Sequence, residues 1–146
     1  LKVWGIIEDE IYASNIEKTF PAGLISWQGY LETNALQLEL GKCRALINTP
    51  KWNEAYGNVV VEAMACGVPV VAYKRGGPSE IIHHGETGFL VPPDDKKNLV
   101  SYVKRINEIK REKCREWVEN NASSKIFADK VIDWLKGVVN GYNIKK

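Results

Sequence analysis

The chain has 146 residues, the length of one ordinary domain or of one half of a two-domain enzyme. Hydrophobic residues make up 45% and charged residues 26%, values that exclude a disordered or collagen-like chain. The net charge of +2, from 20 basic and 18 acidic side chains, gives no support to a nucleic-acid or membrane-surface partner. No apolar run approaches ~18 residues, so no transmembrane segment is expected. The three cysteines are scattered and odd in number, which argues against a secreted disulfide framework and predicts a reducing, cytoplasmic setting.

The chain opens inside an apolar run with no initiator Met and no signal-peptide pattern, so we expect a fragment or an excised domain. Apolar runs closed by Gly, Pro or polar residues predict five strands, at residues 1–7, 24–27, 44–48, 68–73 and 88–91. The stretches between them predict helices near residues 11–20, 36–43, 58–66 and 78–83. This alternation predicts an α/β fold with a Rossmann-like parallel sheet and helices on both faces.

A central stretch and the carboxy-terminal stretch are both predicted to be helical. Val59–Val61 locally favours a strand, but Glu62 and the residues after it favour a helix that Gly67 would end, so we expect a helix. From Asp94 onward the chain is predicted to be helical, with two apolar stripes. The stripes consist of Leu99, Val103, Ile106 and Ile109, and of Ile126, Phe127, Val131, Trp134, Leu135 and Val138.

Two carboxylates, Glu54 and Glu62, stand eight positions apart on either side of Gly57, which permits close approach of the backbone. Glu54 falls in the loop after the third strand, and Glu62 falls in the first turns of the next helix. The free N–H groups of Asn58 and Val59 would lie at the positive end of that helix, where a phosphate binds well. Carboxylates suit the hydroxyl groups of a polyol. Phosphate and polyol together describe a sugar nucleotide.

The same segment resembles the carboxy-terminal, donor-binding half of retaining GT-B glycosyltransferases, a family of mannosyl-, glucosyl- and galactosyltransferases related to sucrose synthase. Its E-x7-E motif is matched by Pro50, Glu54, Tyr56, Gly57, Gly67 and residues 62–65 and 69–72, with further matches at 5, 27–29, 76–82 and 85–91. The resemblance implies one half of a GT-B fold. Residues 1–146 would form a single donor-binding domain, with residues 94–146 as a helical tail packing on it and the amino-terminal acceptor domain absent.

Site roles also follow from the resemblance. Glu54 would contact the donor sugar as the candidate catalytic residue, and Glu62 would hold the ribose. The backbone amides of Gly57, Asn58 and Val59 would approach the sugar and the distal phosphate. Tyr30 and Leu31 would lie near the base.

The implied reaction transfers a hexose, with retention of configuration, from a nucleotide diphosphate sugar to an acceptor hydroxyl. A UDP-sugar and GDP-mannose are both candidate donors. The resemblance implies no metal and no cofactor, in agreement with the lack of an Asp-x-Asp motif in the chain. Inactivity of the chain alone is expected. A longer parent could lie peripherally at the inner membrane face.

The sequence departs from the family pattern in three places. Tyr56 replaces Phe, and Lys51 replaces Ser. The family's first strand and helix, whose G-R-x4-K-G motif neutralises the diphosphate, is missing. In the family's strand order 3-2-1-4-5-6 that strand is central. We therefore expect either that residues 1–7 pair directly with residues 44–48 in a five-stranded sheet, which we favour, or that another segment, for instance from a second copy, fills the gap.

Two other functions stay open. The chain could be a non-catalytic module that binds a nucleotide sugar or a protein partner. It could also be an unrelated flavodoxin-like domain, although the acidic residues 8–10 after the first strand would repel a phosphate.

Other residue types have simpler interpretations. Lys74 and Arg75 suggest a solvated turn more than a phosphate site. His83 and His84 are adjacent, which does not suit a shared metal. Trp117 and Trp134 are expected to be core anchors, and Cys43, Cys66 and Cys114 buried small hydrophobes.

Overall fold

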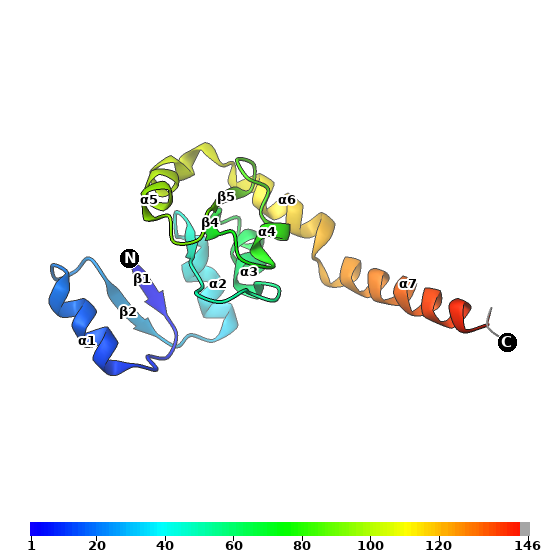
Figure 1. The fold of residues 1–146 in the computed structure, drawn as a ribbon, viewed down its shortest axis with the longest axis horizontal. Coiled ribbons are helices and arrows are strands. Elements are labelled where there is room, and N and C mark those ends of the chain that lie inside the picture. The colour runs from blue at the N-terminus through cyan, green and yellow to red at the C-terminus, as the bar shows by residue number, and fades with distance from the viewer. Residues whose placement is uncertain (144–146) are drawn as a thin grey trace. The chain divides into compact units, whose positions relative to one another are not determined.

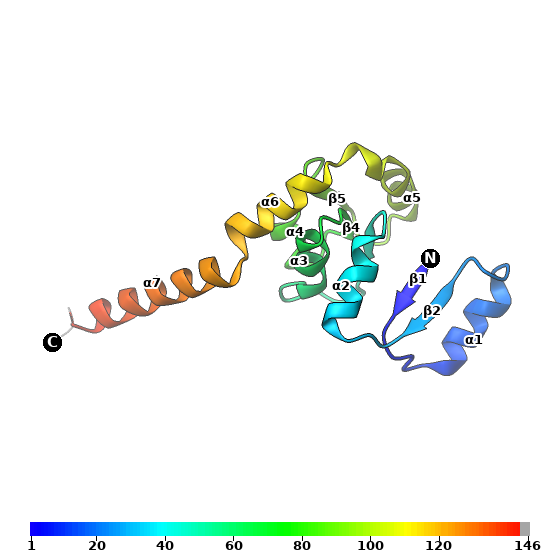
Figure 2. The same cartoon turned by 180° about the vertical axis from the view of Figure 1, so that it is seen from behind.

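The computed structural model describes residues 1–143. Within them the chain forms two compact units, Leu1–Glu39 and the part from Leu40 onward. The amino-terminal unit is a βαβ element made of β1 (Lys2–Trp4), α1 (Glu10–Thr19) and β2 (Ser26–Gly29). β1 and β2 pair in parallel, with Val3 opposite Trp27, and α1 runs alongside both strands in the two opposite views (Figure 1 and Figure 2). Asp9 caps α1 by accepting a hydrogen bond from the Tyr12 N–H at 2.8 Å. α2 (Thr33–Gly41) begins in this unit and ends in the next.

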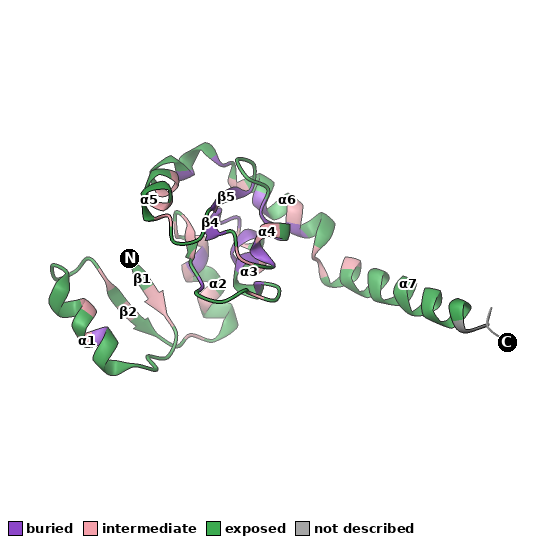
Figure 3. Cartoon of the chain, in the orientation of Figure 1, coloured by how far each residue is buried: buried purple, intermediate pink, exposed green. Residues whose placement is uncertain are grey.

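The second unit contains a parallel sheet of three strands in the order β3–β4–β5. The strands are β3 (Leu46–Asn48), β4 (Val70–Tyr73) and β5 (Gly88–Val91). The helices are α3 (Asn58–Ala65), α4 (Pro78–Ile81), α5 (Lys96–Arg105), a 3-10 turn η1 (Ile106–Glu108), α6 (Arg111–Asn121) and α7 (Ser124–Asn143). Every residue of β4 is buried, and Figure 3 shows the buried positions gathered on β4, β5 and α3. Val60 and Met64 of α3 are fully buried in this core.

The predicted fold class is confirmed, since parallel sheets and helices alternate along the chain. The ambiguous segment 59–66 is helical through Ala65, and Gly67 follows it with a φ of 68°. Helix wins over the local β-propensity of Val59–Val61 because Val60, Ala63 and Met64 then share one face that the core buries completely.

The expected direct pairing of residues 1–7 with residues 44–48 is wrong. Within residues 1–143, β1 pairs with β2 and β3 pairs with β4, and the strands form two separate sheets. β1 and β3 are each three residues long. A direct ladder between strands this short would add few hydrogen bonds, each with a net gain of only about 1 kcal/mol.

The helices after β5 differ in how they are buried. Ile106, Ile109, Cys114 and Val118 join the core, and Trp117 packs against it. In α7, by contrast, Phe127 and Trp134 are each 67% exposed. The prediction of Trp134 as a core anchor is therefore wrong: periodicity indicates an apolar face but does not provide a surface to cover it. Among the described residues, no helix has both the length and the apolarity that a membrane span requires.

Cys114 has no exposed surface, and its thiol donates to the Thr87 carbonyl at 3.3 Å. Burial raises the pKa of Cys114 to about 11, because a thiolate there would lose its hydration. We predict that Cys114 resists iodoacetamide at about pH 8, where only ~0.1% of such a thiol is ionised. Peptide mapping after alkylation checks this in the folded chain, with urea-unfolded protein as the control. Labelling of Cys114 at the same rate in both states would contradict it.

Candidate functional site

The β3–α3 loop, residues 49–57, lies at the carboxyl edge of the three-stranded sheet, next to the turn that follows β4. Glu54 and Gly76 form an isolated parallel bridge, and the Gly77 N–H donates to the Glu54 carbonyl at 2.8 Å. A Cβ atom at Gly76 would lie 2.1 Å from the main-chain carbonyl oxygen of Glu54. One at Gly77 would lie 2.1 Å from the main-chain carbonyl oxygen of Tyr56. The two glycines therefore let the turn approach close enough to fix the main chain of Glu54.

The Glu54 side chain is half-buried, and its carboxylate accepts a hydrogen bond from the Trp52 indole N–H at 3.2 Å. Trp52 itself is 65% exposed. Sequence reasoning missed Trp52, because a single aromatic residue in a loop carries no periodic signal. Its place two residues before Glu54 is the only clue that the sequence offers.

The anion site predicted from the sequence falls at the start of α3. Gly57 is the N-cap, buried and with a φ of 94°, a conformation that favours glycine. The amide N–H groups of Asn58 and Val59 have no acceptor among the described residues, as expected for the first turn of a helix. These amides stand at the positive end of the helix dipole. Glu62 follows one turn later on α3 and is exposed.

The predicted site residues fall into two groups. Glu54, the Gly57–Val59 segment and Glu62 all belong to the second unit and to one loop and its helix. Tyr30 and Leu31 belong to the amino-terminal unit, directly after β2. Tyr30 is 67% exposed and Leu31 is half-buried.

Arg75 does not form the solvated turn that we expected. Its side chain is 18% exposed, donates to the Pro50 carbonyl at 2.8 Å and contacts the Asp94 carboxylate. Lys74, one residue earlier, is exposed and agrees with the expectation. The sequence alone could not show that Arg75 has structural partners while Lys74 is exposed, because adjacent residues in a turn point in different directions.

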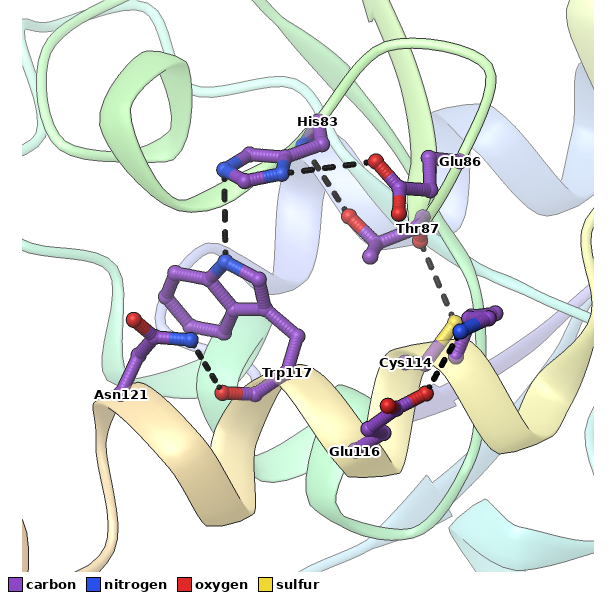
Figure 4. A network of polar contacts seen from close by, with 8 residues as sticks. His83, Glu86, Thr87, Cys114, Glu116, Trp117 and Asn121 are labelled. Carbon is purple, nitrogen blue, oxygen red and sulfur yellow. Dashed lines mark hydrogen bonds and ion pairs between the residues drawn. The ribbon is translucent and has the colours of Figure 1, made fainter.

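The two adjacent histidines have structural partners of their own. His83 Nε2 accepts from the Trp117 indole N–H at 3.3 Å, and His83 Nδ1 lies 3.6 Å from a Glu86 oxygen (Figure 4). His84 Nδ1 accepts from the Leu90 N–H at 3.1 Å. In the part of the chain that the structure describes, no three His, Cys, Asp or Glu side chains come together in a group that could hold a metal ion.

Comparison with known proteins identifies the family. Residues 8–136 match the family model described as glycosyl transferases group 1. A sucrose synthase of Acidithiobacillus caldus is 35% identical over 101 residues, covering 66% of this chain and 13% of that protein. An exopolysaccharide phosphotransferase of Streptomyces coelicolor is 52% identical over 54 residues, covering 36% of this chain and 6% of that protein. The chain thus belongs to the glycosyl transferases of group 1, and it spans only a small part of these relatives.

Solved structures agree on the fold. HepE of Anabaena, in complex with UDP-glucose, has a TM-score of 0.78 at 20% identity, and the match covers 93% of this chain and 40% of HepE. A sucrose-phosphate synthase of Thermosynechococcus elongatus has a TM-score of 0.78 at 23% identity, covering 89% of this chain and 34% of that one. The likeness shows that the chain has the fold of part of a GT-B glycosyltransferase.

The close contact at Gly77 can be tested by a single added methyl group. Gly77→Ala should lower the free energy of unfolding by about 1–3 kcal/mol, because the Cβ would collide with the Tyr56 carbonyl and must displace the loop. Urea denaturation followed by circular dichroism measures the change. Gly137→Ala in α7 is the matched control: its Cβ meets nothing, so this change should stabilise the helix by roughly 0.5–1 kcal/mol. Equal effects of the two substitutions would refute the proposed contact.

Proposed function

We propose that the chain is the donor-binding part of a retaining glycosyltransferase that moves a hexose from a nucleotide diphosphate sugar to an acceptor hydroxyl. The observation that carries this proposal is the start of α3, where the Asn58 and Val59 amides lack acceptors among the described residues. Glu54 precedes these amides in the loop, and Glu62 follows them on the helix. Because the chain belongs to the group 1 family, we interpret this arrangement as a site for a sugar nucleotide.

Each residue takes a role suited to its group. The amides after Gly57 would meet the distal phosphate, since uncharged donors at a helix start bind anions without needing a counterion. Glu54 would accept hydroxyl donors from the sugar, and Glu62 would accept those of the ribose. Tyr30 and Leu31 are assigned to the base by resemblance alone.

The amides also suit the chemical step. In the reaction the bond from the anomeric carbon to the diphosphate oxygen breaks, and a bond from the same carbon to the acceptor oxygen forms on the same face. The acceptor hydroxyl gives up its proton, which the departing diphosphate can take. Negative charge grows on the departing diphosphate. Fixed N–H donors at a helix start would stabilise that charge more in the transition state than in the ground state. We therefore propose that neither a metal nor a cofactor is needed.

UDP is the first nucleotide to test. HepE has been solved with UDP and with UDP-glucose. A mutant of S. aureus TarM, a further solved structure with a similar fold, has been solved with UDP. GDP-mannose is the alternative donor.

We propose that the acceptor site belongs to an amino-terminal domain of a longer protein, active in the cytoplasm or peripherally at the inner membrane face. We also propose that a further polypeptide segment, from that protein or from a second copy, takes the place of the strand that the family pattern has and this chain lacks.

Calorimetry with UDP and UDP-glucose tests the binding roles, with excess EDTA present so that binding is measured without metal. Glu62→Ala should weaken UDP about tenfold to a hundredfold, because a charged hydrogen bond to ribose is worth roughly 1.5–3 kcal/mol. Glu54→Ala should weaken UDP-glucose but leave UDP nearly unchanged, and in a longer parent it should lower turnover. Glu112→Ala on α6 removes the same charge elsewhere and serves as the control. Equal UDP affinity in wild type and Glu62→Ala would refute the ribose assignment.

The purified chain alone should not transfer sugar. Residues on one wall of a cleft can bind a donor but cannot align an acceptor, and alignment supplies much of the rate. Incubation with UDP-[14C]glucose and sugar acceptors, followed by chromatography, measures transfer. Radiolabelled product formed by the chain alone would show that this division of labour is wrong. Absence of binding by UDP, GDP and ADP would instead favour a partner-binding module.

A further inference from the structure

Arg75 joins three segments of the second unit. Its Nη1 donates to the Pro50 carbonyl at 2.8 Å, and its Nη2 lies 2.5 Å from Asp94 Oδ2. Its guanidinium carbon lies 5.8 Å from the centroid of the Tyr73 ring. The side chain therefore connects the start of the β3–α3 loop, the end of β4 and the connection between β5 and α5.

The two residues after Arg75 hold the same loop further along. Gly76 bridges to Glu54, and the Gly77 N–H donates to the Glu54 carbonyl. Residues 75–77 thus fix both ends of the short segment from Pro50 to Glu54. Residues 51–53, between these two points, are exposed. The main chain of Glu54 is therefore held by backbone contacts. The path of residues 51–53, which lead to Glu54, depends on the Arg75 side chain.

Asp94 is the acidic partner of Arg75, and we call this pair, with its contact to Pro50, the clamp. It has a φ of 65°, and it is the sole non-glycine residue with positive φ among those described. Such a conformation costs an ordinary side chain of order 1–3 kcal/mol and persists only where the surroundings impose it. Its ion pair with the half-buried Arg75 is one such constraint, and a planar guanidinium can serve a carboxylate and a carbonyl at once.

We infer that Arg75 is a positioning residue, which fixes the β3–α3 loop so that the Glu54 carboxylate is held ready for the sugar of the donor. This inference rests on the proposed function. The competing role, direct contact of Arg75 with the diphosphate, predicts a different pattern. A direct contact would affect UDP and UDP-glucose equally, and removal of the Asp94 charge would strengthen anion binding. If Arg75 acts as a clamp, its loss weakens UDP-glucose binding more than UDP binding. Loss of the Asp94 charge then weakens binding instead of strengthening it.

The experiment uses the whole chain and three variants: Arg75→Gln, Asp94→Asn and the control Arg115→Gln. Asn tolerates positive φ as Asp does, so Asp94→Asn removes charge without adding backbone strain. Arg115 pairs with Glu119 on the exposed face of α6, away from the loop. Hydrogen–deuterium exchange of a peptide covering residues 51–57 reports the loop without any ligand. Calorimetry with UDP and UDP-glucose reports the site.

Arg75→Gln should speed exchange in this peptide about tenfold, because local opening becomes easier. It should weaken UDP-glucose about tenfold and UDP less than about threefold, since a misplaced Glu54 loses only the sugar contact. Asp94→Asn should change the exchange rate and the UDP-glucose affinity in the same directions by smaller amounts. Arg115→Gln should change neither the exchange rate nor the affinities.

Unchanged exchange in Arg75→Gln would overturn the inference. So would an equal loss of UDP and UDP-glucose affinity together with tighter UDP binding by Asp94→Asn, which marks a direct phosphate contact. If the wild-type chain binds no nucleotide, the proposed function fails, and the exchange rates still decide whether Arg75 fixes the loop.

Discussion

The contact between the β3–α3 loop and the turn after β4 is the constraint on which the candidate site depends. Two glycines bring the turn within hydrogen-bond distance of the Glu54 carbonyl, where any Cβ would collide with backbone oxygens. Because this contact is made by the main chain, it sets the path of the loop independently of the side chains that the loop presents. The start of α3 then follows from the left-handed turn at Gly57. A chemically simple feature, the absence of two Cβ atoms, thus determines where a carboxylate and a helix start lie.

The molecule separates the tasks of packing and binding. β4 and the inner face of α3 are buried and contribute apolar contacts, while the outward groups at the carboxyl edge stay accessible. This division is common to parallel α/β sheets, because the chain crosses back through helices on the faces and leaves the carboxyl ends of the strands to short loops. Polar groups placed there cost little stability, since they keep their contact with water until a ligand replaces it.

Much of the fold and part of the site could be predicted from the sequence. The alternation of apolar runs and amphipathic stretches located all five strands, and the spacing of Glu54, Gly57 and Glu62 located the loop and helix start, because these signals are local. Trp52 was given no role and Arg75 was expected in a solvated turn, because the contacts of both side chains join residues that the spacing rules do not connect. The split into two sheets was also missed. Pairing between strands depends on which edges meet, and apolar pattern does not encode that.

The pairing of Trp52 with Glu54 has a practical consequence. An exposed indole whose N–H contacts a carboxylate senses both the polarity and the charge of its surroundings, so its emission would change when that carboxylate changes partner. The chain contains five tryptophans, and Trp52 alone among them lies in the β3–α3 loop. Replacing the other four with phenylalanine would leave a native optical probe beside Glu54, with no dye attached to the loop.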